Sequence, residues 1–298
     1  MQRPVSLLDR QWLDEWLGSR LNFAQPMFDS TQHDTLPREI DDPALAKLAD
    51  ALTQAWRQKL TLDDGRWAGS LRHPEEAERV ALAVVGRLDG DPVPSAWKCG
   101  GASRDPAALS HAPLPLAGVR MAREHEVLDL RDCWLPCGGV EAEIALQLAE
   151  DVSPDEARAL QPGEGQSLIG GMAVAIELVA SRWHGGADAP ALLRAADLHS
   201  HGALALGPWQ PWSERDWSAQ ACSLQFETQA AVQRTGSHPL GDPSWLWASW
   251  LQFLTRDGQT VPAGSVVTTG SWLGTLPLRR RERLCVSFAG IGALTLQL

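Results

Sequence analysis

The chain has 298 residues, of which 44% are hydrophobic and 21% are charged, and its formal net charge is -11. This composition is typical of a globular protein that buries a core, and a negative charge of this size repels nucleic acid and anionic membrane surfaces. We therefore expect no nucleic-acid partner and no membrane partner, and an anionic substrate would need a local positive centre.

The five cysteines are odd in number and irregular in spacing, which argues against a disulfide framework. Cys133 and Cys137 lack a second ligand pair that would complete a zinc site. No apolar segment reaches the length of about 18 residues that a membrane span needs. Residues 1–16 carry charges throughout, unlike a signal peptide, so we expect a cytoplasmic protein.

The N-terminal part of the sequence, residues 1–90, predicts an irregular arm followed by helices. A short helix is expected over residues 7–17. Helical spacing of apolar residues predicts a second helix over residues 42–59, with Asp41 or Asp42 as its cap. A third is expected over residues 74–88, because Pro-Glu-Glu begins it and a turn sequence follows it.

The pattern changes near residue 90, and residues 91–298 are predicted to form a β-rich, metal-binding catalytic domain. Short apolar runs predict strands over residues 140–148, 172–180, 265–269 and 284–288. Ser153, Pro154 and Glu156 have the spacing of a capping box, which predicts a helix over residues 153–160. A Trp-rich helix is expected over residues 244–254. The fold class expected from this order is α+β.

Two carboxylates stand two residues apart in the first predicted strand. In a strand, Glu141 and Glu143 project from one face while the alternating apolar residues, from Ala142 to Leu148, face a core. Neighbouring carboxylates repel unless one is protonated or a cation lies between them. Mg²⁺ or Mn²⁺ suits such hard oxygen ligands, and the alternative is a solvated strand face.

Two further charged residues stand in apolar surroundings. Glu177 is the lone charge in an apolar strand, where it either ligates a metal, forms a salt bridge with Arg182 or lies at a sheet edge. Lys98 lies between Trp97 and Cys99, where it either transfers a proton and pairs with a carboxylate or extends from a strand end towards solvent.

Hydroxyl groups and histidines supply the remaining candidates. Thr269, Gly270 and Ser271 follow a predicted strand, and they either bind a substrate carboxylate or form a tight turn. His199 and His201 could ligate a metal or donate protons from a strand, but their Ser and Gly neighbours favour a loop.

In this order, these stretches resemble the fumarylacetoacetate-hydrolase superfamily, specifically the 2-keto-4-pentenoate hydratases and 2-oxohepta-3-ene-1,7-dioate hydratases. The resemblance extends over roughly residues 43–298. Its motifs are Trp-Lys-Cys-Gly at 97–100, Val-Glu-Ala-Glu-Ile-Ala at 140–145, Ile-Glu-Leu-Val-Ala-Ser-Arg at 176–182, Leu-Gly-Asp-Pro at 240–243, the Thr-Gly-Ser stretch at 269–271 and Phe-Ala-Gly-Ile-Gly at 288–292.

The resemblance implies a mixed β-roll with Glu141, Glu143 and Glu177 as ligands of Mg²⁺ or Mn²⁺. It also implies that Lys98 is the active-site lysine and that residues 269–271 bind the substrate carboxylate. The chain departs from the family pattern in three places: residues 118–121 lack an expected Asp, residues 196–202 replace an Asp-Asn-rich segment, and residues 279–283 replace a Gly. Residues 1–40 look like an addition to the family core.

The function implied is a hydro-lyase that adds water to a 2-hydroxy-2,4-dienoate or 2-oxo-alkenoate to give a 4-hydroxy-2-oxo acid. The alternatives are a decarboxylase acting on a 2-oxo-3-enedioate, a hydrolase cleaving the C–C bond of an acylpyruvate, and a non-catalytic partner that retains the fold. The family suggests a homo-oligomer, and tryptophans on the surface between Trp245 and Trp250 could be buried at its interface.

Overall fold

The computed structural model describes residues 40–90, 94–136 and 138–298. The helix predicted over residues 7–17 and the side chain of Cys137 lie outside the described residues. All described residues belong to one structural unit, residues 36–298. None of the helices in these three ranges is long and apolar enough to cross a membrane.

The first two described helices are α2 (Pro43–Gln58) and α3 (Pro74–Asp89), which confirms both predictions. Their ends follow from local chemistry. The Asp42 carboxylate caps α2 by accepting from the Ala44 amide at 2.8 Å, and Gly90 ends α3 at a φ of 75° that suits glycine.

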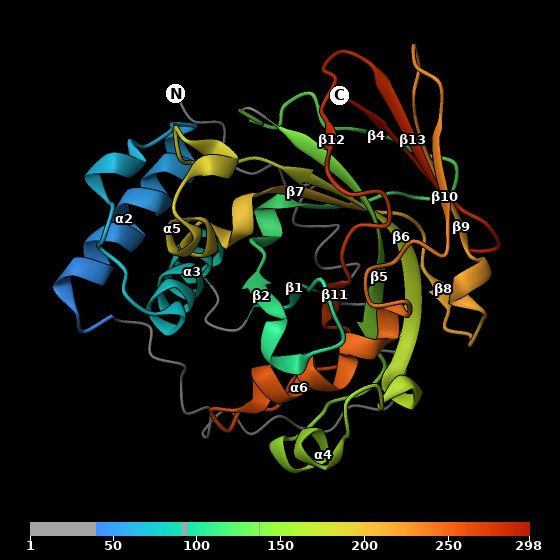
Figure 1. Cartoon of the computed structure of the whole chain (residues 1–298), viewed down its shortest axis with the longest axis horizontal. Coiled ribbons are helices and arrows are strands. Elements are labelled where there is room, and N and C mark those ends of the chain that lie inside the picture. The colour runs from blue at the N-terminus through green and yellow to red at the C-terminus, as the bar shows by residue number, and fades with distance from the viewer. Residues whose placement is uncertain (1–39, 91–93, 137) are drawn as a thin grey trace. The chain divides into compact units, whose positions relative to one another are not determined.

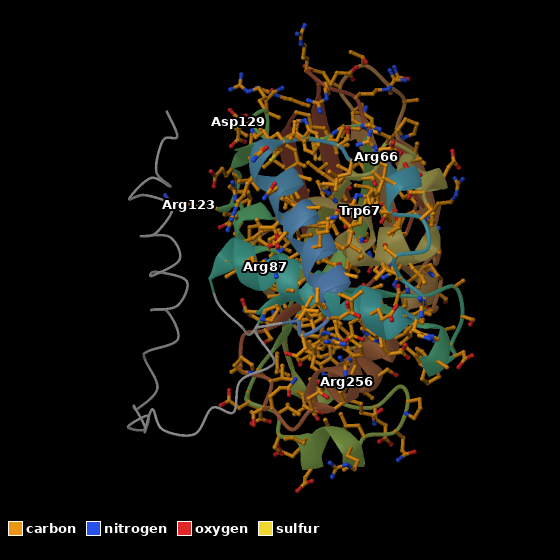
Figure 2. The ribbon with its side chains drawn as sticks, turned by 90° about the vertical axis from the view of Figure 1, so that its left-hand side faces the viewer. Arg66, Trp67, Arg87, Arg123, Asp129 and Arg256 are labelled. Carbon is orange, nitrogen blue, oxygen red and sulfur yellow. The ribbon has the colours of Figure 1, made fainter. Side chains whose placement is uncertain are left out.

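A helical layer forms from α2, α3 and a later helix, α5 (Ala191–Ala196), on one side of the large sheet (Figure 1). Leu48 and Leu52 of α2 pack with Val80 and Val84 of α3 in this layer. Figure 2 shows its outer face, where Arg87 of α3 pairs with an aspartate of α2 at 3.6 Å. Because α5 follows the β-rich segments in sequence, residues on both sides of position 90 build this layer.

A nine-stranded mixed sheet carries the functional residues. Its main path runs β2-β1-β11-β5-β6-β7-β3, with β12 beside β5 and β8 beside β6. Its strands are β1 (Ala96–Gly100), β2 (Ser110–Pro113), β3 (Val119–Met121), β5 (Gly139–Leu148), β6 (Ile169–Val179), β7 (His201–Leu206), β8 (Gln210–Pro211), β11 (Val266–Thr268) and β12 (Leu276–Pro277).

The second sheet has five strands in the order β10-β9-β13-β14-β4. These strands are β4 (Val127–Asp129), β9 (Ala221–Phe226), β10 (Val232–Thr235), β13 (Arg283–Phe288) and β14 (Gly292–Gln297). Side chains of β9, β13 and β14 share one core with the apolar face of β5 and β6. Ile144 and Ile176 lie in this core and have no exposed surface, as the period of two in their strands requires.

Two helices close the lower edge of the large sheet in Figure 1: α4 (Pro154–Ala159) and α6 (Trp247–Thr255). The capping box between Ser153 and Glu156 is present as predicted. The prediction of surface tryptophans is wrong for Trp247 and Trp250, which are fully buried in the chain's own core. These two rings are therefore already covered within the chain, on the side of α6 that packs into its core.

Candidate metal centre and active site

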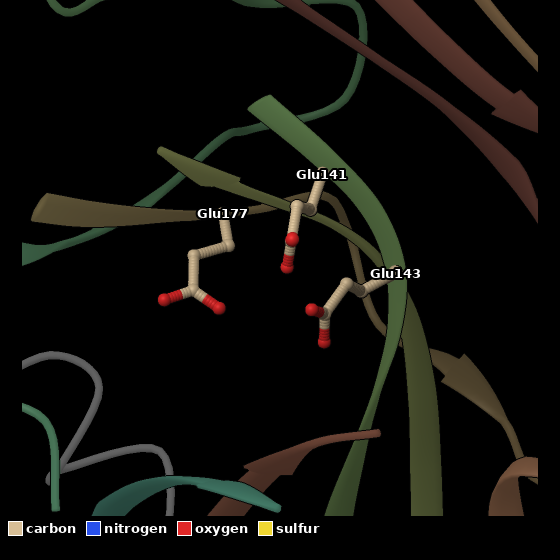
Figure 3. Close-up of side chains that lie close together, drawn as sticks. All are labelled: Glu141, Glu143 and Glu177. Atoms are coloured by element: carbon tan, nitrogen blue, oxygen red, sulfur yellow. The ribbon is translucent and has the colours of Figure 1, made fainter. Parts of the chain in front are cut away.

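The pairing of β5 with β6 brings three carboxylates to one face of the large sheet. Glu141 lies directly opposite Glu177 in the antiparallel register, and Glu143 lies one pair further along the same face. One oxygen from each carboxylate lies within 4.8 Å of the other two. Figure 3 shows the three side chains converging on a common space from the two strands.

The electrostatics of this cluster are strongly unbalanced. Glu143 is 2% exposed and Glu177 is 1% exposed. Burial, and then the like charges of Glu177 and Glu141, raise the pKa of Glu143 to about 8. Without a metal ion, the cluster therefore holds a proton on Glu143 near neutral pH. A divalent ion between the three oxygens would remove the repulsion that retains this proton.

Lys98 joins the cluster from β1. Its Nζ donates to Oε1 of Glu177 at 2.6 Å and to the carbonyl of His199 at 3.4 Å. Burial alone would lower the pKa of the ammonium, but the three neighbouring carboxylates outweigh that effect and raise it. Lys98 is therefore held in the cluster by Glu177 and does not extend freely from a strand end.

His201 is a member of the site that the loop interpretation missed. It is the first residue of β7, it has no exposed surface, and its Nδ1 lies 3.1 Å from Oε1 of Glu177. Burial opposes ionisation of Glu177, but Lys98 and His201 outweigh it and lower the pKa of that carboxyl to about 2. The loop interpretation was wrong for His201, because backbone pairing with β6 extends the strand to this residue.

Arg182 does not pair with Glu177, contrary to one alternative for that carboxylate. It forms a fully buried ion pair with Asp197, Nε to Oδ1 at 2.6 Å, and its Nη2 donates to the carbonyl of His201 at 2.5 Å. The guanidinium lies 4.2 Å from the ring centre of Trp56, and that ring also stacks with the imidazole of His201. A residue of α2 thus helps to fix His201 beside Glu177.

The Thr-Gly-Ser stretch follows β11 and borders the three carboxylates. The Thr269 hydroxyl donates to the Ile144 carbonyl at 2.8 Å, and the Gly270 amide donates to Oε2 of Glu143 at 2.9 Å. The Ser271 hydroxyl donates to the Gly274 carbonyl at 3.0 Å. The Ser271 bond is the exposed one of these three, and the Ser271 hydroxyl also accepts from the Leu273 amide at 3.4 Å.

The backbone geometry explains why glycine occupies position 270. Its φ is 97°, a conformation that disfavours a side chain. A Cβ built on Gly100, at the end of β1, would lie 3.7 Å from the Gly270 Cα. That distance is an ordinary van der Waals contact, so the positive φ is what favours glycine at position 270.

His238 bonds the backbone of the Thr-Gly-Ser stretch, and the sequence analysis did not single it out. Its Nε2 donates to the Thr269 carbonyl at 2.8 Å, and its Nδ1 accepts from the Leu240 amide at 3.3 Å. Burial lowers the pKa of His238 to about 4, so the ring is neutral at neutral pH. The feature of the sequence that could have identified His238 is its position two residues before the Leu-Gly-Asp-Pro motif at 240–243.

The donor set fits a hard divalent cation. All three candidate ligands are carboxylates, and Glu143 and Glu177 are buried on one face. Oε2 of Glu177 is fully buried and has no hydrogen-bond partner among the described residues, while Oε1 is held by Lys98 and His201. A buried carboxylate oxygen without a partner is costly unless a cation binds it.

The family model for the fumarylacetoacetate (FAA) hydrolase C-terminal domain matches residues 129–298. The chain belongs to the fumarylacetoacetate hydrolase family. The match includes all three carboxylates, Arg182, His201 and the Thr-Gly-Ser stretch. A comparison with curated proteins gave no match.

Solved structures show the same fold at low sequence identity. 4-Oxalocrotonate decarboxylase from Pseudomonas putida G7, complexed with magnesium and adipate, has a TM-score of 0.69 at 18% identity, covering 89% of this chain and 99% of that chain. Fumarylpyruvate hydrolase from Pseudomonas aeruginosa, in complex with Mn²⁺ and pyruvate, has a TM-score of 0.50 at 18% identity, covering 68% of this chain and 88% of that chain. These similarities confirm the predicted α+β fold of the family type.

Two departures from the family pattern lie next to each other in this family member. The segment at 118–121, which lacks the expected Asp, forms β3 and pairs with β7, which begins in the altered segment 196–202. A Cβ on Gly118 would lie 3.5 Å from Nε2 of His201. The two altered segments are therefore joined through β3 and β7, and Gly118 lies beside the His201 ring.

Proposed function

We propose that this chain is a divalent-metal-dependent hydratase that adds water to a 2-hydroxy-2,4-dienoate, through its 2-oxo-3-enoate form, to give a 4-hydroxy-2-oxo acid. One observation carries the proposal: three carboxylates with ligand oxygens within 4.8 Å of one another, beside a half-buried lysine. Family membership supports it, as do the metal ions named with the fold's structural relatives.

Glu141, Glu143 and Glu177 would hold Mg²⁺ or Mn²⁺. When bound, the metal supplies Lewis-acid chemistry that stabilises negative charge on the substrate carboxylate and 2-oxygen. Side chains of the protein keep a ligand ionised and bind the substrate. Glu177 is kept ionised by Lys98 and His201, and Ser271 binds the substrate carboxylate by turning its hydroxyl away from the Gly274 carbonyl.

The reaction has two proton-balanced stages. First, the 2-hydroxyl loses its proton and C5 gains one, which converts the dienol into a conjugated 2-oxo-3-enoate. Second, the oxygen of water bonds to C4 and a proton is added to C3. Lys98 is cationic beside Glu177 and orients the substrate anion by its remaining N–H groups, and a proton that it gives to C5 is replaced by the one lost from the 2-hydroxyl.

The test is an ultraviolet assay with 2-hydroxypenta-2,4-dienoate, performed with Mg²⁺ and with a chelator. The expected result is Mg²⁺-dependent loss of the dienol absorbance with formation of 4-hydroxy-2-oxopentanoate. No reaction by a protein that binds metal would reject hydration. No reaction and no metal binding would support the non-catalytic alternative.

Decarboxylation of a 2-oxo-3-enedioate is the second candidate. The observation that favours it is the whole-length structural similarity to 4-oxalocrotonate decarboxylase, which covers 99% of that chain. The two reactions separate cleanly, because decarboxylation releases CO₂ and hydration does not. Including an enedioate and an acylpyruvate in the same assay distinguishes the decarboxylase and hydrolase branches from the hydratase.

A further inference from the structure

A left-handed turn precedes β7 at the edge of the metal centre. Three successive residues that are not glycine, Leu198, His199 and Ser200, have φ values of 53°, 50° and 60°. Such residues seldom adopt positive φ, and a run of them persists only where the surrounding structure enforces it. Backbone strain of this kind concentrates at functional sites, so the contacts that hold the turn and the group that it presents both matter.

The turn is held at both ends. Before it, the buried Asp197 carboxylate accepts from Nε of Arg182 at 2.6 Å and from the Arg182 amide at 2.8 Å. Leu198 has no exposed surface and packs against two residues of α3. After it, the Ser200 carbonyl accepts from the Ala180 amide at 2.7 Å, which joins the turn to the end of β6.

The turn brings His199 beside Lys98 at the edge of the metal centre. Its carbonyl lies 3.4 Å from the Nζ of Lys98, and the ring interacts electrostatically with both Lys98 and Glu177. Burial, and then Lys98, lower the pKa of its imidazole to about 4, which leaves the ring neutral at neutral pH. A neutral imidazole offers one nitrogen that accepts a proton and one that donates.

The ring nitrogens of His199 are also uncommitted. Neither has a hydrogen-bond partner among residues 40–90, 94–136 and 138–298, and neither is fully buried. By contrast, His201 is held by Glu177 and His238 is held by the Thr269 carbonyl. His111 lies flat against Phe253, with ring centres 4.2 Å apart.

We propose that His199 is a further catalytic residue, which accepts a proton from the attacking water and returns it to the substrate. The step follows from the proposed function and rests on it. As the water oxygen bonds to C4, one O–H bond breaks and its proton moves to the imidazole, while the C3=C4 electron pair shifts towards C2 and its oxygen. The imidazolium then protonates C3, which restores the neutral ring and completes the 4-hydroxy-2-oxo acid.

The test separates the two stages of the reaction in His199→Asn, because asparagine tolerates the left-handed conformation. The wild type and the variant are each given 2-oxopent-3-enoate, to measure water addition alone, and the dienol, to measure ketonisation. We expect water addition to fall by about 100-fold or more, which is the usual contribution of a proton-transferring side chain. Ketonisation, the Mn²⁺ dissociation constant and the melting temperature should stay at wild-type values.

His125→Asn is the matched control, because His125 is also a histidine with a positive φ, 62°, and its side chain is 91% exposed. It should add water at the wild-type rate. Full water addition by His199→Asn would overturn the inference, as would loss of both stages together with Mn²⁺ binding, which would indicate a structural role. A wild type that is inert towards both substrates would overturn the proposed function and this inference with it.

Discussion

The two faces of the β5–β6 pair are built on opposite principles. One face buries Ile144 and Ile176 in an apolar core that it shares with the second sheet. The other face buries Glu143 and Glu177, which are held there by a lysine, a histidine and the Gly270 amide. The apolar face is held by packing against the second sheet, whereas the acidic face is held by specific polar partners from distant segments.

The largest effect on stability is expected from Arg182→Ala. This change leaves Asp197 buried without its cation and removes the support of the His201 carbonyl. Breaking a buried ion pair costs roughly 3–5 kcal/mol. Urea unfolding would measure the loss. The control is Arg158→Ala in an exposed pair, where Arg158 is 73% exposed and the unfolding midpoint should hardly move. Equal losses of stability in the two variants would contradict the claim that the buried ion pair contributes more than the exposed one.

Lys98→Met tests whether the acidic face needs its cation for chemistry. We expect turnover of the dienol to fall by about 100-fold or more, because the positive group beside the substrate is lost. Mn²⁺ affinity should persist, since the three carboxylates remain. Steady-state kinetics and electron paramagnetic resonance of bound Mn²⁺ check the two parts separately. Full activity in this variant would show that Lys98 has only a structural role.

Lowering the pH should destabilise the folded protein through His238, the histidine that bonds the Thr269 carbonyl. Burial lowers the pKa of His238 to about 4, below its ordinary value in the unfolded chain. The unfolded state then binds the proton more readily, so stability is complete above a pH of about 6.5 and falls as the pH drops towards 4. Urea midpoints across this range should decline less steeply in His238→Gln. An identical decline would exclude His238 as a cause.

The smallest effect is expected on the apolar face. Ile144→Val removes one methylene from a fully buried side chain, which costs about 0.5–1.5 kcal/mol. The variant should unfold at a lower urea concentration and yet show the same Mg²⁺-dependent rise in melting temperature as the wild type. A loss of the Mg²⁺ effect would mean that the two faces are not independent.

The sequence predicted the parts of this molecule that depend on local pattern. The alternation in β5 identified Glu141 and Glu143 on one face, and the lone charge in β6 identified Glu177. Caps and prolines gave the limits of α2 and α3 to within one residue. Each of these features is set by neighbours in sequence, which is why it could be predicted.

The rest depends on contacts between distant segments. Lys98 and Glu177 are 79 residues apart, and Trp56 reaches the site from a helix that precedes the whole sheet. The buried pair of Arg182 with Asp197 and the strand position of His201 follow from the packing of β6 against β7. Periodicity carries no information about such pairings.

The most direct test of the central claim compares the wild type with Glu143→Gln, in which a proposed ligand is lost with almost no change in volume. Melting temperatures are measured with Mg²⁺ and with chelator. For the wild type, a Mg²⁺ concentration of 100 times the dissociation constant should stabilise the fold by about 2.7 kcal/mol. The account predicts that Glu143→Gln loses this Mg²⁺-dependent rise. An unchanged rise in the variant would remove Glu143 from the metal site and contradict the account.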